Sequence, residues 1–72
     1  MNQKVKVLLV QDCFGRWILV HGEDHELAWT GSQWVGINPA TGLSDHYQIA
    51  NSDSREHAHE YAEQFDFEVT VQ

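Results

Sequence analysis

The sequence contains one cysteine, one proline, only four Lys and Arg residues and no long apolar run. The single cysteine, Cys13, cannot form a disulfide within the chain, which favours a reducing compartment. No stretch approaches the roughly 18 apolar residues that a membrane-spanning helix requires, and the N-terminus lacks a signal-peptide pattern. These scarcities predict a cytoplasmic protein that is not inserted in a membrane.

Positive charge is scarce because 11 Asp and Glu residues outweigh the Lys and Arg residues, which leaves a net charge of −7. Residues 23–50 contain no Lys or Arg at all. Proteins that bind nucleic acid need these cations to displace the counterions of the phosphates. The composition therefore predicts no direct binding of nucleic acid, and it favours a protein partner with a basic surface.

The apolar and aromatic content is sufficient for one small domain that spans residues 1–72. Hydrophobic residues make up 42% of the chain, and they include three Trp, three Phe and two Tyr residues. A chain of this length buries only about 60% of its unfolded surface, so its core has to be efficient. This composition favours a compact domain over a disordered chain.

Residues 54–65 have the pattern of an amphipathic helix. One stripe of the helix is apolar and consists of Ala58, Tyr61, Ala62 and Phe65, at positions i, i+3, i+4 and i+7. Ser54 is the favoured N-cap, and Asp53 is the competing one. After the helix the period changes to two, because Phe67, Val69 and Val71 alternate with polar residues. Residues 67–71 are therefore predicted to form a half-buried strand.

The first half of the chain has the β-branched and aromatic composition of strands. The predicted strands are residues 4–11, 16–21, 26–30 and 33–37, with residues 43–50 as a weaker fifth candidate. Turns are expected at residues 12–15 and at Gly31-Ser32, and a two-residue loop there pairs Trp29 with Trp34.

We therefore expect an α+β fold. A four- or five-stranded antiparallel sheet, arranged as a β-meander, carries one C-terminal helix on one face and is completed by a closing strand. The predicted core consists of Val5, Val7, Leu9, Ala58, Tyr61, Ala62, Phe65, Phe67 and Val69.

The residues that commonly form catalytic or metal sites show no recognisable pattern. His57 and His59 are two positions apart on the predicted helix, so they point in different directions. Cys13 belongs to a turn beside Asp12, and a nucleophilic thiol needs a base and an anion-stabilising site around it. No Cys/His zinc spacing, phosphate-binding glycine loop or serine elbow is present. The sequence predicts a non-enzyme without catalytic residues, metal or cofactor.

The acidic face of the predicted helix is the strongest candidate for a binding site. Glu56, Glu60 and Glu63 lie about 6 Å apart along one side, and Asp53 extends this row at the N-terminus. Asp66 and Glu68 are candidates to extend it at the other end. Like charges at this spacing cost a few tenths of a kcal/mol per pair. The row therefore predicts either a surface that complements a basic partner or an acidic face that is merely solvated.

The tryptophans suggest a second surface. One helix covers one face of a sheet, so the other face is expected to expose some of Trp17, Trp29 and Trp34 or branched apolar residues. We count Trp29 and Trp34 among the candidate partner-binding residues, and a homodimer through that face is one outcome. The alternative is that residues 38–50 cover that face.

The C-terminal tail resembles the end of many short phage and mobile-element proteins. The segment Ser54-Arg55-Glu56-His57-Ala58 leads into Tyr61-Ala62 and then into Phe67-Glu68-Val69. The resemblance implies a relation to phage inhibitors of host polymerases and to anti-CRISPR proteins, which are for the most part small, acidic and non-enzymatic.

Two functional hypotheses follow from these observations. In the first, the chain inhibits a nucleic-acid-handling complex by placing its acidic helix face on a basic surface of that complex. In the second, it is a self-associating structural domain whose Trp-bearing sheet face is buried between copies, and its acidity serves only solubility.

Overall fold

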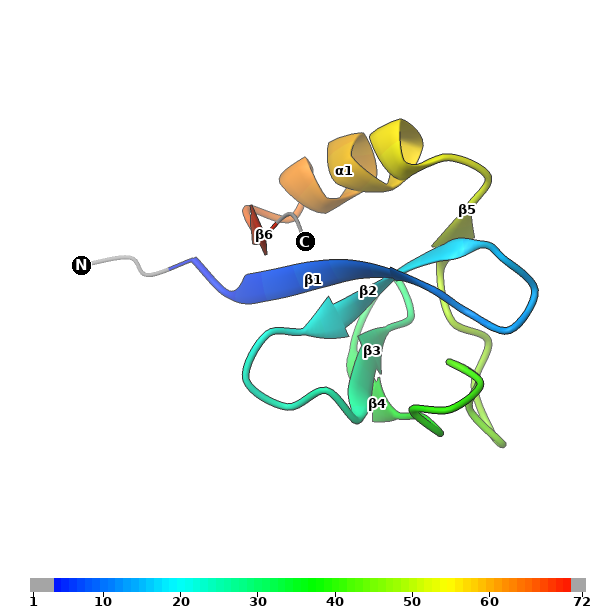
Figure 1. The fold of residues 1–72 in the computed structure, drawn as a ribbon. Helices are drawn as coiled ribbons and strands as arrows, with labels where there is room; N and C mark the ends of the chain where they lie inside the picture. Colours follow the sequence, from blue (N-terminus) through cyan, green and yellow to red (C-terminus); the bar gives the residue numbers. More distant parts are fainter. Residues whose placement is uncertain (1–3, 71–72) are drawn as a thin grey trace.

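The computed structural model describes residues 4–70, which form one helix and a six-stranded sheet (Figure 1). The elements in chain order are β1 (Lys6–Gln11), β2 (Trp17–His21), β3 (Leu27–Trp29), β4 (Trp34–Gly36), β5 (Asn51–Ser52), α1 (Arg55–Glu63) and β6 (Glu68–Thr70). The helix lies across one face of the sheet (Figure 1). The predicted α+β class, the single helix and the closing strand are confirmed.

The sheet is mixed, whereas the sequence predicted an antiparallel meander. Its strand order is β4-β3-β2-β1-β6, and β5, which is not part of this path, pairs with the first two residues of β2. Strands β1 to β4 are antiparallel neighbours, but β6 runs parallel to β1 with Val7 opposite Val69. The direction follows from the connection: β5 already runs parallel to β1, and α1 is the crossover that returns the chain in the same direction.

Both predicted hairpin turns are present. Gly15 and Gly31 have φ angles of 80° and 114°, a region that glycine enters without steric cost. In the second turn the Thr30 amide donates to the Gln33 carbonyl at 3.0 Å. That bond closes a two-residue loop and sets Trp29 opposite Trp34, as predicted.

Residues 43–50 do not form the fifth strand that was predicted for them. Residues 43–50 form a loop with a single bridge between Asn38 and Leu43, and the short β5 begins only at Asn51. The Ser44 hydroxyl accepts from the amides of His46 and Tyr47, both at 3.3 Å. Such local bonds offer the backbone an alternative to a sheet ladder.

The core has two layers, one on each face of the sheet. The helix side contains Val7, Leu9, Leu19, Ala58, Ala62 and Phe67. The other side contains Ile18, Val20, Ala28, Val35 and Ile49. Because Ile49 comes from the 38–50 loop, this loop covers part of the sheet face opposite the helix.

Most of the predicted core residues are correctly placed. Tyr61, Phe65 and Val69 are half-buried against the helix-side cluster rather than enclosed in it. Val5 is 38% exposed, so its assignment to the core was wrong, because β1 begins only after it. The predicted contribution of Val71 lies outside the described residues.

Candidate functional site

The acidic helix face is positioned by the start of α1. Ser54 has an extended backbone, with φ −131° and ψ 154°, and its hydroxyl accepts from the His57 amide at 3.2 Å. This contact confirms Ser54 as the N-cap. Glu56 lies in the first turn, where the helix dipole stabilises an anion.

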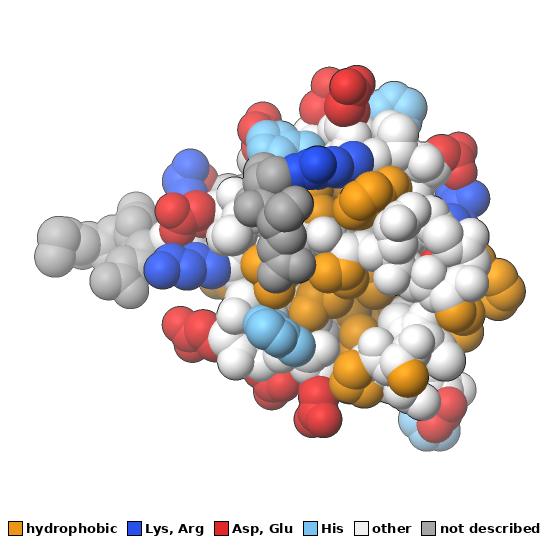
Figure 2. Space-filling model, in the orientation of Figure 1, with side chains coloured by type: hydrophobic (Ala, Val, Ile, Leu, Met, Phe, Trp, Pro, Cys, Tyr) orange, Lys and Arg blue, Asp and Glu red, His pale blue; other side chains and the backbone are white. Residues whose placement is uncertain are grey.

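The helix separates an apolar side from a charged side. Ala58 and Ala62 are buried against the sheet, while Glu56, Glu60 and Glu63 are all exposed. Figure 2 shows carboxylates along the outer surface of α1, with histidine side chains among them. The predicted row of three glutamates therefore exists on the surface.

The three glutamates are not equivalent. The Glu63 carboxylate lies 3.1 Å from Nδ1 of His59, one turn earlier on the helix. Glu56 and Glu60 take part in no ion pair within residues 4–70. Of the three glutamates, Glu56 and Glu60 in the first two turns of α1 are therefore the two without such a contact.

The carboxylates expected to lengthen the row are engaged elsewhere or point elsewhere. Asp53 lies 2.6 Å from the guanidinium of Arg16, the residue before β2, and Asp66 lies 3.4 Å from the Lys4 ammonium. Glu68 is exposed on β6, where it alternates with the inward-facing Phe67 and Val69. Of these residues, only Asp53 is a predicted site residue, and the Arg16 contact offsets its charge.

Trp29 and Trp34 lie in a different place from the one predicted. Their ring centroids are 5.2 Å apart, and both rings pack on the helix side against Phe67. The sheet face opposite the helix carries branched apolar residues instead of tryptophan. Tryptophan or branched apolar residues were expected on that face; the branched apolar residues are there, and the tryptophans pack with the helix-side cluster.

The two groups of predicted site residues are thus not brought together into one site. Trp29 and Trp34 are half-buried in an aromatic cluster that also includes Phe65, whose centroid is 5.4 Å from that of Trp29. Figure 2 shows hydrophobic side chains reaching the surface between α1 and the β-hairpins below it. The indole Nε1 of Trp29 is buried without a hydrogen-bond partner among the described residues.

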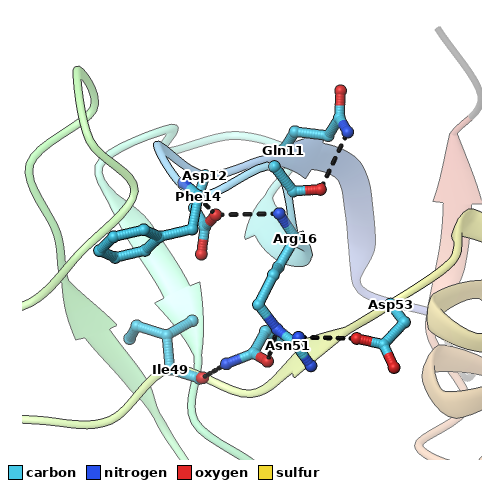
Figure 3. Close-up of polar contacts among 8 residues, drawn as sticks. Gln11, Asp12, Phe14, Arg16, Ile49, Asn51 and Asp53 are labelled. Carbon is cyan, nitrogen blue, oxygen red and sulfur yellow. Dashed lines mark hydrogen bonds and ion pairs between the residues drawn. The ribbon is translucent and has the colours of Figure 1, made fainter.

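A polar network beside the helix N-terminus was not predicted from the sequence. The Arg16 side chain donates to the Asn51 amide oxygen and pairs with Asp53, and the Asn51 amide donates to the Ile49 carbonyl at 3.0 Å (Figure 3). This network joins the β1–β2 turn to β5. No local spacing signals it, because its members come from separate elements.

The residue types that commonly form metal or catalytic sites are dispersed over the described part of the chain. Within the part of the chain that the structure describes, no three His, Cys, Asp or Glu side chains are grouped as metal ligands. Cys13 is exposed in the β1–β2 turn. In the same residues, no helix is long and apolar enough to cross a membrane.

No protein-family model, curated protein or solved structure matches this chain.

Proposed function

We propose that this chain is a non-enzymatic, cytoplasmic binding protein that occupies a basic, nucleic-acid-binding surface of another protein with the outer face of α1. The observation that supports this proposal is the pair Glu56 and Glu60. These carboxylates are exposed one helical turn apart, and neither has an ion-pair partner within residues 4–70.

An unpaired glutamate pair at this spacing costs the free helix a few tenths of a kcal/mol. A surface that serves stability alone mixes both charge signs. Lys4 and Arg16 do neutralise carboxylates elsewhere, at Asp66 and Asp53. Arg55, the first residue of α1, is the one Lys or Arg in the first two turns, and it forms no ion pair within residues 4–70. Glu56 and Glu60 outnumber this one cation, so these turns remain negative.

A row of carboxylates suits a surface that has evolved to hold phosphates, because both present regularly spaced negative charge to Lys and Arg side chains. Competition with nucleic acid for that surface would make the chain an inhibitor of a nucleic-acid-handling complex. Phage inhibitors of host polymerases and anti-CRISPR proteins are the functional class that we propose.

The alternative, a homodimer held by Trp29 and Trp34, has less support. Both rings already pack against Phe67, the residue before β6, and both are half-buried. Two copies that each carry a net charge of −7 also repel one another.

The test is a capture experiment with bacterial lysate at low and high salt. The immobilised baits are the wild-type chain, a Glu56→Lys/Glu60→Lys variant, and a Glu23→Lys/Glu26→Lys control. Glu23 and Glu26 are exposed near the β2–β3 turn, away from α1. Each reversal adds two positive charges, so both variants carry a net charge of −3.

We expect the wild type and the control variant to retain the same basic, nucleic-acid-binding protein at low salt. The helix variant loses it, and high salt weakens retention by the wild type. Circular dichroism confirms that all three baits are folded. If the folded helix variant retains the partner as fully as the control variant does, the acidic face is only solvated and the proposal is wrong.

A further inference from the structure

Exposed apolar side chains gather at the end of the molecule that carries the β1–β2 turn. Phe14, at the turn, is 74% exposed, and Tyr47 and Leu43 of the 38–50 loop are 51% and 37% exposed. All three line one hollow of about 230 Å³. Within residues 4–70, Val5 is the one other large hydrophobic residue of this exposure, and it lies at the opposite end of β1. We call Phe14, Leu43 and Tyr47 the Phe14 patch.

The turn that carries Phe14 is held in one conformation by a set of hydrogen bonds. One Asp12 carboxylate oxygen accepts from the amides of Phe14, at 2.9 Å, and Arg16, at 3.0 Å (Figure 3). The Gln11 side-chain amide donates to the Gly15 carbonyl at 3.0 Å. The Phe14 ring points away from this polar network (Figure 3).

A further bond fixes the turn relative to the rest of the patch. The Cys13 amide donates to the Thr41 carbonyl at 2.8 Å, which ties the β1–β2 turn to the loop that carries Leu43 and Tyr47. The three side chains are thus presented together on an ordered backbone. A preorganised aromatic side chain loses little further freedom on binding, which is the property of an anchor residue.

The charges around the patch indicate the chemistry of its partner. Arg16 also lines the hollow, but Asp53 and Asn51 already occupy its guanidinium. Asp45, next to this segment of the loop, is exposed and forms no ion pair within the described residues. Asp12 lines the hollow as well, so Asp12, Asp45 and Asp53 outnumber the one cation, Arg16. The rim is therefore negative around an apolar centre, and it complements an apolar ligand that carries Lys or Arg.

We propose that the Phe14 patch binds an extended segment of another protein that combines apolar side chains with Lys or Arg. Because the three side chains line a hollow, the partner supplies an apolar side chain that enters it and the cations that face its negative rim. A stable dimer interface buries about 800 Å² on each partner, which is far more than three side chains provide. Two copies of a chain with a net charge of −7 also repel one another at this rim.

The surface is tested with a phage-displayed library of random linear peptides, selected on the immobilised wild-type chain. Synthetic copies of the enriched peptides are then titrated against the wild type and against Phe14→Ser, Tyr47→Ser and Val5→Ser variants. We expect the enriched peptides to combine aromatic or aliphatic residues with Lys or Arg. Phe14→Ser and Tyr47→Ser weaken their binding about tenfold or more, whereas Val5→Ser leaves it unchanged.

Folding does not obscure this test, because Phe14 and Tyr47 are exposed and their replacement leaves the thermal midpoint close to that of the wild type. The Glu56→Lys/Glu60→Lys variant separates this surface from the helix face, because peptides docked on the Phe14 patch still bind it. Peptides that bind Phe14→Ser fully, or that lack cationic residues, overturn the proposal. So does a wild-type dimer, or binding to phosphatidylcholine vesicles, that Phe14→Ser abolishes.

Discussion

Phe67 is the residue on which the aromatic packing converges. Its ring centroid lies 5.2 Å from that of Trp29, 5.6 Å from that of Trp34 and 5.7 Å from that of Phe65. Phe67 is 9% exposed, whereas Phe65 is half-buried. The enclosed ring therefore contributes more to stability than its neighbour on the helix side.

Replacing Phe67 with Ala is expected to lower the free energy of unfolding by about 3–5 kcal/mol. Phe65→Ala, at a half-buried position, is expected to cost about 1–2 kcal/mol. Urea denaturation followed by tryptophan fluorescence measures both values. Equal costs for the two variants, or a larger cost for Phe65→Ala, would show that the packing of the cluster differs from this description.

Gly42 packs the 38–50 loop against the β1–β2 turn. Its φ is 73°, and an added Cβ would lie 2.9 Å from the Cβ of Asp12 and 3.1 Å from Cδ1 of Ile18. Gly42→Ala is therefore expected to lower the free energy of unfolding by more than about 1 kcal/mol. The control is Gly36→Ala, because a Cβ there meets nothing within 4 Å. Thermal melts that place the two variants at the same midpoint would contradict this prediction.

Single residues were predictable from the sequence where their role is local. Ser54 caps the helix that follows it, and Gly31 occupies the turn that it was predicted to occupy. Asp53 was predicted to extend the acidic row, but its contact with Arg16 was not predicted, because this contact joins distant parts of the chain. The exposure of Phe14 was not anticipated, although an aromatic side chain in a tight turn between two strands has little room to point inward.

At the scale of elements, α1 depends on its N-cap, because the Ser54 hydroxyl satisfies the otherwise unpaired His57 amide. Ser54→Ala is expected to lower the free energy of unfolding by about 1 kcal/mol. Ser54→Asp retains an accepting oxygen at the cap and is expected to lower the free energy of unfolding by much less. Chemical denaturation followed by far-UV circular dichroism compares the two variants. A Ser54→Ala variant as stable as the wild type would contradict this role of the cap.

The alternation of apolar and polar residues predicted that β6 exists and that it is half-buried. This pattern did not predict the direction of β6, because a period of two is the same in parallel and antiparallel pairs.

The weaker prediction of a strand over residues 43–50 was wrong for a different reason. Ile49 is buried as expected of a strand residue, but the hydroxyl of Ser44 organises a local turn earlier in that segment.

At the scale of the whole molecule, charge separates the two functional hypotheses. Each copy carries a net charge of −7, and its tryptophans pack within the chain on the helix side. We therefore expect a monomer in sedimentation velocity at about 0.1 M salt, where screening acts over about 10 Å. A dimer that Trp34→Ser converts to a folded monomer would instead favour the self-associating domain.

The proposed inhibition requires that the outer face of α1 and a nucleic acid compete for one basic surface. The most direct measurement titrates a duplex nucleic acid into the purified complex of this chain with its partner and follows release of the chain by fluorescence anisotropy. Competition for one surface predicts complete displacement, with an apparent Kd for the chain that rises in proportion to the concentration of the competitor. A ternary complex, in which the chain stays bound at saturating nucleic acid, would contradict it.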